Sequence, residues 1–310
     1  LFRSIVKLVS SEGIGTIAVG VAKAGADVIN VAGNTGGTGA ASVTSLRYAG
    51  RAAEIGLAEV HQALCANGLR NKVILRTSGA HQTGHDVVTS ALLGADSFEF
   101  GTAALMMVGC VIAKNCNIQC PAGLTTNPEV FEGDPRAMAQ YLLNVAHEVR
   151  EILAQLGFRT LEEAIGHVEC LDQDEAIKRW KSSGIDLSNV LKQAGPVPGT
   201  ILHQTIEQNH ELEKALDNKL IELAQPALEH KEPVRIEMPI RNVNRTVGTM
   251  VGYEITRRYG EEGLPDDTID MTLHGSGGQS IGAFIPRGET MRIYGEVNDY
   301  AGKGLSGGRM

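Results

Sequence analysis

The sequence predicts an α/β fold in three parts: the second half of a (β/α)8-type barrel, a helical connecting region, and the start of a right-handed parallel β-helix. Three observations predict it. Short β-rich runs alternate with helical stretches over the first 105 residues, the middle of the chain has an amphipathic helical period, and glycine-rich turns separate short β-rich runs from Glu237 onward. We expect the three parts to span residues 1–125, 126–235 and 236–310.

The first part contains short apolar runs that predict buried strands, each followed by a helical stretch. We expect strands at 5–10, 26–33, 72–79 and 96–102, and helices near 15–26, 54–67 and 84–95. Strands that alternate with helices form right-handed parallel β/α units. Four such units make half of an eight-stranded barrel, which cannot close by itself. Because the chain begins with Leu, almost directly in a strand, we expect a preceding part of the polypeptide or an assembly partner to supply the missing strands.

Capping residues place the main helix of the second part. Asp134 is a typical N-cap, Pro135 suits the first helical position, and Gly157 suits the position just after the helix. Other helices are expected at 160–163, where TLEE reads as a capping box, at 174–184, and from 209 to about Pro226.

The third part predicts stacked β-coils. Runs such as TIDMTL and ETMRIYGEV alternate with the glycine-rich turns HGSGGQSIGAF and GKGLSGGR. Regular short strands separated by glycine are typical of a parallel β-helix. The sequence stops at Met310, where a further strand is expected.

Composition excludes several classes of partner. The chain has 36 acidic and 28 basic residues, a net charge of −8, and no concentrated Lys/Arg stripe, so nucleic acid is not expected as a partner. No apolar run approaches the ~20 residues that span a bilayer, and the first residues do not have the pattern of a signal peptide. Five cysteines, an odd number and clustered, favour a reducing compartment and a cytoplasmic location.

Glycines at two consecutive strand ends predict a phosphate site. In a β/α barrel the active-site groups follow the carboxyl ends of the strands, and the last two loops commonly bind phosphate. The residues at these positions are Ser78, Gly79, Gly84, Gly101 and Thr102. Backbone N–H groups at such turns attract a phosphate dianion. The alternative is that these glycines only make tight turns.

Two other features of the strand ends could contact a cofactor. Lys7 interrupts the apolar run IVKLV, and a lysine in a barrel mouth can hold a substrate carboxylate or stabilise a reduced flavin. The alternative is an edge strand with Lys7 in solvent. The loop NTGGTGA at 34–40 contains Gly36, Gly37 and Thr38, and it does not have the spacing of a Rossmann dinucleotide motif.

Three cysteines form the pattern Cys110-x5-Cys116-x3-Cys120-Pro. Short intervals between thiolates, with proline after the last, are typical of iron–sulfur loops. Three ligands suit a three-iron cluster, or a four-iron cluster with one outside ligand. Zinc with a histidine or Cys65, inert core thiols and a disulfide remain alternatives. The scattered histidines His61, His81 and His85 are interpreted as surface or supporting residues.

Long stretches of the chain resemble the synthase domain of the large subunit of glutamate synthase. They include VKLVSSEGIGTIAVGVAKAGADVINVAGNTGGTGA, GLAEVHQAL, TGHDVVTSALLGADSFEFGTAALMMVGC with the cysteine loop, and GDPRAMAQYLLNVAHEVREILAQLGFRTLEEAIG. The runs LDNKLIELAQPAL, IRNVNRTVGTMVGYEITRRYG and GSGGQSIGAFIPRGETMRIYGEVNDYAGKGLSGGR resemble the glycine-repeat β-helix domain and the helices before it. The resemblance covers essentially the whole chain in the family's order.

The resemblance implies a β/α barrel that carries FMN beside a 3Fe-4S cluster. Electrons would enter at the cluster from ferredoxin or from an NADPH-oxidising subunit and pass to FMN. Ammonia from a separate glutaminase (amidotransferase) domain would condense with 2-oxoglutarate, and reduced FMN would deliver hydride to 2-iminoglutarate to give glutamate. The sequence does not contain the amidotransferase domain or the first barrel half.

The resemblance also implies roles for single residues. Cys110, Cys116 and Cys120 match the cluster ligands, and Lys7 matches a lysine near the flavin and 2-oxoglutarate. The residues that match cofactor-loop positions are Gly36, Gly37, Gly79, Gly101 and Thr102. The chain departs from the family where the last cysteine interval has three residues instead of four. It also departs in the loops after the second and third strands, with Asn34-Thr35 in place of His-Asp and with Ser78 and Ala80 in place of an acid and a glutamine.

Two other functions also fit the sequence. One is an FMN-barrel oxidoreductase that acts on a different amine or imine. The other is a non-catalytic assembly subunit of such a complex, in which the β-helix docks other domains.

Overall fold

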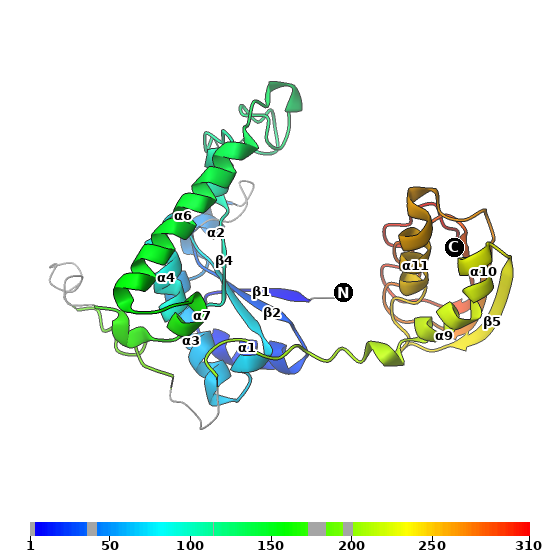
Figure 1. Ribbon diagram of the computed structural model, residues 1–310, viewed down its shortest axis with the longest axis horizontal. Coiled ribbons are helices and arrows are strands. Elements are labelled where there is room, and N and C mark those ends of the chain that lie inside the picture. The colour runs from blue at the N-terminus through cyan, green and yellow to red at the C-terminus, as the bar shows by residue number, and fades with distance from the viewer. Residues whose placement is uncertain (1–3, 36–41, 114, 173–183, 195–200) are drawn as a thin grey trace. The chain divides into compact units, whose positions relative to one another are not determined.

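The computed structural model describes residues 4–35, 42–113, 115–172, 184–194 and 201–310. The chain divides into two compact units, Leu1–Gln208 and Asn209–Met310 (Figure 1). The connecting region expected at 126–235 is therefore shared between the two units.

Among the described residues of the first unit, four parallel strands form a sheet in the order β1-β2-β3-β4. Their bounds are Ile5–Val9 for β1, Val28–Ala32 for β2, Ile74–Ser78 for β3 and Ser97–Glu99 for β4. These are the predicted strands, each somewhat shorter than expected. Val9, Ala32, Ser78 and Glu99 are register partners, so the carboxyl ends of all four strands lie at one end of the sheet.

Helices follow the strands of the first unit along the chain. Their bounds are α1 Ile14–Lys23, α2 Val43–Tyr48, α3 Ala53–Ala66, α4 Gly84–Leu92, α5 Thr102–Met107, α6 Pro135–Leu156 and α7 Leu161–Ala164, with short 3-10 turns at Arg70–Lys72, Pro128–Val130 and Val168–Cys170. The sequence analysis did not predict α2 or α5.

The core of the first unit lies between the sheet and the helices α1 and α3. Ile29 and Leu75 of the strands are fully buried against Ile14 of α1 and Leu57 of α3. Burial of each such side chain stabilises the fold by roughly 1.5–3 kcal/mol. On β1 the pattern differs, because alternate residues along this strand remain exposed.

The caps of α6 are those predicted, and α6 packs against α4 (Figure 1). Asp134 Oδ1 accepts the N–H of Arg136 at 2.9 Å, and Gly157 ends the helix with a φ of 87°. At α7 the expected capping box is half formed. Thr160 Oγ1 accepts the N–H of Glu163 at 3.3 Å, but the Glu163 carboxylate accepts from the N–H of Arg159 instead of the cap residue. The helix expected at 174–184 lies almost wholly outside the described residues.

The second unit contains a parallel sheet in the order β5-β6-β7, among its described residues. The bounds are β5 Val234–Ile240, β6 Ile269–Ser276 and β7 Glu289–Glu296, with helices α9 Leu216–Leu223, α10 Gln225–His230 and α11 Thr249–Tyr259 and 3-10 turns at Leu212–Lys214 and Gly260–Glu262. Its core joins Leu220 and Leu228 to Ile255 and to Ile269 and Met271 of β6.

The prediction of one helix from 209 to Pro226 was wrong. The helical segment breaks at Ala224, and Pro226 lies in the first turn of α10. The first N–H groups of a helix have no intrahelical acceptor, so proline is tolerated there.

Stacked strands give the second unit its regularity. Ile240, Gly275 and Gly295 are register partners on neighbouring strands. A Cβ on Gly275 would lie 2.3 Å from the Ile240 carbonyl oxygen, and one on Gly295 would lie 2.0 Å from the Gly275 oxygen, so both positions require glycine. Among the helices described in either unit, none is long and apolar enough to cross a membrane.

Candidate functional site

A large open cleft lies at the carboxyl ends of β1 to β4. Its volume is about 1270 Å³, and its walls come from β1, from the residues after β2, β3 and β4, and from parts of α2, α5 and α6. Five residues that the sequence analysis proposed for binding or catalysis line it: Lys7, Ser78, Gly79, Gly101 and Thr102. The fold therefore brings together residues that are up to 95 positions apart in the chain.

Lys7 is the cation that β1 presents to this cleft. Its side chain is exposed, and it alternates with the half-buried Val6 and Leu8. β1 is also an edge strand of the described sheet. Lys7 is therefore both exposed on an edge strand and directed to the cleft, the two positions that the sequence analysis treated as alternatives. An exposed ammonium at the mouth of parallel strands can attract an anionic ligand.

Glycine is required at two strand ends because α3 begins directly above them. A Cβ on Gly79 would lie 2.7 Å from the Ala53 Cβ, and one on Gly33 would lie 2.9 Å from the Ala53 nitrogen. Gly101 differs, since a Cβ there would meet nothing within 4 Å. Gly101 stands just before α5 and has no side-chain cap. Its surroundings are thus open to a ligand.

The remaining predicted loop residues are not part of the described lining. Gly84 faces α6, where its N–H donates to Glu148 Oε2 at 2.6 Å and a Cβ would lie 2.8 Å from the backbone nitrogen of Val149. The structure thus uses Gly84 for helix packing. Gly36, Gly37 and Thr38 lie outside the described residues.

An aromatic wall of the cleft escaped the sequence analysis. The rings of His81 and Phe100 are 5.9 Å apart, and those of Phe100 and Tyr141 are 6.3 Å apart. The Tyr141 hydroxyl donates to the carbonyl oxygen of Gln82 at 2.7 Å, which ties α6 to the loop after β3. Burial lowers the pKa of His81, whose Nε2 lies 3.0 Å from Ser90 Oγ. The sequence signal that could have located this wall is Phe100, an aromatic residue directly after β4.

The cysteine loop presents thiols with hydrogen-bond donors around them. The N–H of Ile112 donates to Cys110 Sγ at 3.4 Å. Burial would raise the pKa of Cys120, but the N–H groups of Ala122, Thr125 and Leu124 and the Thr125 hydroxyl lower it to about 7. Cys116 is half-buried.

These donors fit the chemistry of thiolate ligands, since N–H groups that donate to sulfur are a feature of iron–sulfur sites. The positions of the three thiols do not yet form a ligand set. Among the described residues, which leave out Lys114 of this loop, no three His, Cys, Asp or Glu side chains gather closely enough to hold a metal ion. The cleft is large enough for FMN, because its volume exceeds that of a typical ligand pocket. It also contains the Lys7 ammonium and the unobstructed backbone of Gly101, which suit a phosphate group.

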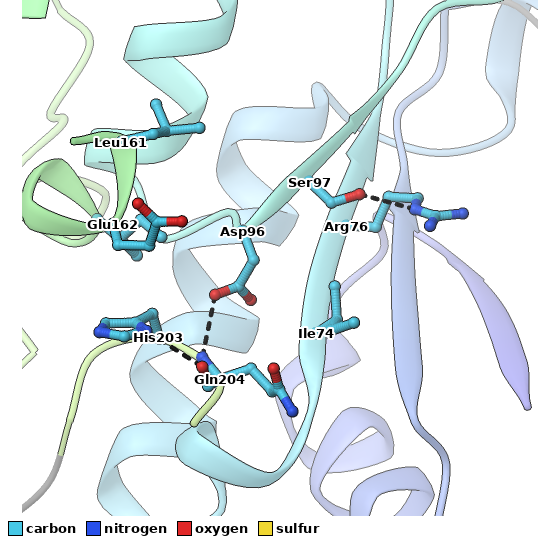
Figure 2. A pocket seen from close by; sticks show the side chains of 9 residues that line it. Ile74, Arg76, Asp96, Ser97, Leu161, Glu162, His203 and Gln204 are labelled. Carbon is cyan, nitrogen blue, oxygen red and sulfur yellow. Dashed lines mark hydrogen bonds between the residues drawn. The ribbon is translucent and has the colours of Figure 1, made fainter. Parts of the chain in front are cut away.

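A second, smaller cavity lies at the opposite, amino ends of β3 and β4 (Figure 2). Its volume is about 260 Å³. Asp96 stands at its centre, but both carboxylate oxygens are engaged. Oδ1 accepts the N–H of Gln204 at 3.1 Å, and Oδ2 accepts the N–H of Leu75 and a guanidinium N–H of Arg70, each at 2.6 Å.

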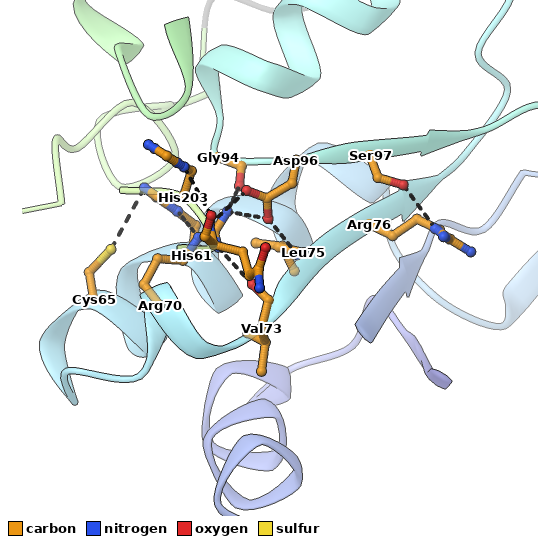
Figure 3. A network of polar contacts seen from close by, with 11 residues as sticks. His61, Cys65, Arg70, Val73, Leu75, Arg76, Gly94, Asp96, Ser97 and His203 are labelled. Carbon is orange, nitrogen blue, oxygen red and sulfur yellow. Dashed lines mark hydrogen bonds and ion pairs between the residues drawn. The ribbon is translucent and has the colours of Figure 1, made fainter. Parts of the chain in front are cut away.

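Arg70 is the centre of a buried network beneath this cavity (Figure 3). It is 0% exposed and also donates to His61 Nδ1 at 3.2 Å and to the carbonyl oxygens of Val73 and Gly94. Burial and the Arg70 charge lower the pKa of His61 to about 3. The network joins α3 to the amino ends of the strands and serves the fold.

Residues 3–159, half of the chain, match the protein family described as "Conserved region in glutamate synthase". The chain belongs to the glutamate synthase family. Residues 217–310 match a second family, described as "GXGXG motif".

Relatives of this family extend over nearly the whole chain. The chain is 49% identical to the glutamate synthase [NADPH] large chain of Bacillus subtilis, over 99% of this chain and 20% of that protein. It is 45% identical to the glutamate synthase [NADH] of Schizosaccharomyces pombe, over 99% of this chain and 15% of that protein. It is 39% identical to the ferredoxin-dependent glutamate synthase of Pyropia yezoensis, over 98% of this chain and 20% of that protein. The chain thus spans a fifth or less of the length of these relatives.

Proposed function

We propose that this chain forms part of a glutamate synthase, a flavoenzyme that reductively aminates 2-oxoglutarate to glutamate. The observation that carries the proposal is the convergence of four parallel strand ends on one cleft, with Lys7 exposed in it, in a chain of this family. FMN, when bound in the cleft, would supply the hydride for 2-iminoglutarate.

The cleft residues would divide the work of binding. The Lys7 ammonium would hold the carboxylates of 2-oxoglutarate or the negative charge of the reduced flavin. The peptide groups at Ser78-Gly79 and Gly101-Thr102 would meet the phosphate. The loop with Gly36, Gly37 and Thr38 would contact the cofactor as well. The aromatic wall of His81, Phe100 and Tyr141 would exclude water from one side of the cleft.

Cys110, Cys116 and Cys120 would hold a 3Fe-4S cluster. The thiolate-stabilising donors around Cys110 and Cys120 support this assignment. Metal binding commonly organises ligands that are not gathered beforehand, so we expect the loop to close around the cluster. Electrons would come from ferredoxin or from an NADPH-oxidising subunit.

Other parts of the enzyme would complete the site. The exposed fractions of Ile5 and Val9 on β1 are 53% and 49%, which supports a covering first barrel half. A glutaminase domain would supply ammonia. Residues 1–125 would then form the second barrel half, 126–235 the helical connection and 236–310 the start of a right-handed β-helix, in a cytoplasmic protein.

The cluster is tested by Cys116→Ser in the natural protein that contains these residues, purified without oxygen. We expect loss of iron, of acid-labile sulfide and of the visible cluster absorbance, with unchanged far-UV helicity. Cys170→Ser is the matched control, because Cys170 is also half-buried but lies outside the loop. Unchanged iron in Cys116→Ser would remove this residue as a ligand.

The substrate is tested by Lys7→Met in the same protein. We expect the KM for 2-oxoglutarate to rise or the rate of flavin oxidation by the imine to fall by at least tenfold, about 1.4 kcal/mol. Equal kinetics would refute the role of Lys7. Bound FMN with turnover only of another imine would favour the oxidoreductase alternative. A protein with neither flavin nor iron would favour the assembly subunit.

A further inference from the structure

Glu289 is a carboxyl group buried inside the second unit. It is the first residue of β7, its side chain is 0% exposed, and neither Oε1 nor Oε2 has a hydrogen-bond partner among the described residues. An ionised carboxylate in this place would lose its hydration and gain no donor in return. Such a group is stable in a protein interior only when it is paired or neutral.

The nearest source of donors is already used. The amino end of a helix offers free N–H groups, and α11 begins beside Glu289. Asp217 of α9 takes most of them. The N–H groups that donate to Asp217 Oδ1 are those of Gly248, Met250 and Val251, at 3.0, 2.9 and 3.4 Å. The fourth, that of Thr249, donates to the Thr246 carbonyl at 3.1 Å. No N–H group of this turn remains for Glu289.

Glu289 is held against this same turn of α11. A Cβ on Gly248 would lie 2.7 Å from Glu289 Oε1, and one on Gly252 would lie 3.3 Å from Oε2. Only glycine leaves room for the carboxyl group at Gly248. Two carboxyl groups, from α9 and β7, thus meet at the start of one helix. Burial, and then the Asp217 charge, raise the pKa of Glu289 well above its ordinary value.

The lysine and arginine side chains of α9, α11 and β7, together with Arg287 and Arg309 beside β7, pair with other acids. Those pairs are Lys219–Glu222 on α9, Arg257–Glu254 and Arg258–Glu254 on α11, Arg292–Asp270 on β7 and β6, and Arg287–Asp266, Arg309–Asp266 and Arg309–Asp267 beside β7. Within the described part of the chain, no ion pair reaches Glu289. Asp217 is therefore the charged group that acts on it.

We propose that Glu289 is a neutral acid at neutral pH and that its loss of a proton to solvent loosens α11 from β7, which makes the second unit pH-sensitive. Ionisation would place a second negative charge beside Asp217 in a dry site. The folded chain binds this proton more tightly than the unfolded chain. The stabilisation is therefore complete below the ordinary pKa of glutamate and is lost as the pH rises through the raised pKa of the folded state.

The test is hydrogen exchange of the full 310-residue chain, followed by mass spectrometry over residues 249–259, from about pH 6 to pH 9. After correction for intrinsic exchange, we expect the protection of α11 to fall by about tenfold for each pH unit between the ordinary pKa of glutamate and the raised pKa of Glu289, and to level off above the raised pKa. Glu289→Gln keeps the shape of the side chain and removes its titratable proton, so the protection of α11 in this variant should not change with pH. Glu296→Gln is the matched control, because Glu296 is exposed on the same strand. It should behave as the unaltered chain does.

The same pH dependence in Glu289→Gln and in the unaltered chain would overturn the proposal. If Glu289→Gln does not fold, the unaltered chain still tests it by infrared spectroscopy. A protonated-acid carbonyl band should be present at neutral pH, shift when glutamate is isotopically labelled, and disappear at high pH. Its absence at neutral pH would also overturn the proposal.

Discussion

Replacement of Arg70 by methionine should destabilise the first unit strongly. Arg70→Met keeps much of the apolar stem but removes the guanidinium that donates to Asp96, His61, Val73 and Gly94. Loss of one partner from a buried ion pair costs about 3–5 kcal/mol, because the other charge stays buried. Asp96 keeps two backbone N–H donors, so we expect a loss near the lower limit, about 3 kcal/mol.

Hydrogen exchange over β2 and β3 measures this loss within the first unit. A decrease of about 3 kcal/mol corresponds to exchange that is more than ~100-fold faster for amides that exchange by global unfolding. Arg76→Met is the control, because Arg76 is 27% exposed and its contacts are with Ser97 Oγ at 3.0 Å and the Glu99 carboxylate at 3.7 Å. It should cost under about 1 kcal/mol. Equal effects of the two variants would refute the reasoning.

Two further predictions concern the pH dependence and the packing of the first unit. The pKa of His61 is lowered from 6.5 to about 3, so only the unfolded chain takes up this proton as the pH falls. Its contribution to stability is present above pH 6.5 and is lost towards pH 3, and urea titrations should show a fall of about 2 kcal/mol from about pH 8 to pH 5 that His61→Gln removes. Gly84→Ala should lower the melting temperature, since its Cβ would lie 2.8 Å from the Val149 nitrogen, at a cost of about 1–3 kcal/mol. Gly101→Ala, with nothing within 4 Å, should leave the melting temperature unchanged, and an equal fall in both variants would contradict the packing argument.

The strands of the first unit could be predicted because short β-rich runs alternate regularly with helical stretches along the chain. A strand such as β2 is buried along almost its whole length, and Val28–Ala32 contains four apolar residues of five. The same reasoning failed at α5 and α11. The helix α5 has no buried residue, and the N-cap of α11 is Gly248, which has no side chain to cap the helix, so each lacks one of the signals from which a helix is predicted.

The candidate site could be predicted where it depends on chain topology. Parallel strands place their carboxyl ends together, and therefore Lys7, Gly79 and Gly101 could be expected on one cleft from the order of the strands alone. The aromatic wall could not, because Tyr141 comes from α6, a helix that is separated from the strand ends by the cysteine loop. Only the packing of α6 on α4 brings this residue to the cleft.

The two ends of the sheet differ in how their polar groups are satisfied, and this difference decides where chemistry is available. At the amino ends, Asp96 and Arg70 use their polar atoms on each other and on backbone groups, so the small cavity there offers a ligand little. At the carboxyl ends, Lys7 is exposed and Gly101 borders open space. A buried network stabilises the fold by saturating its hydrogen bonds, whereas a binding site needs groups that are held in place but not saturated. The same sheet thus meets both requirements at opposite ends.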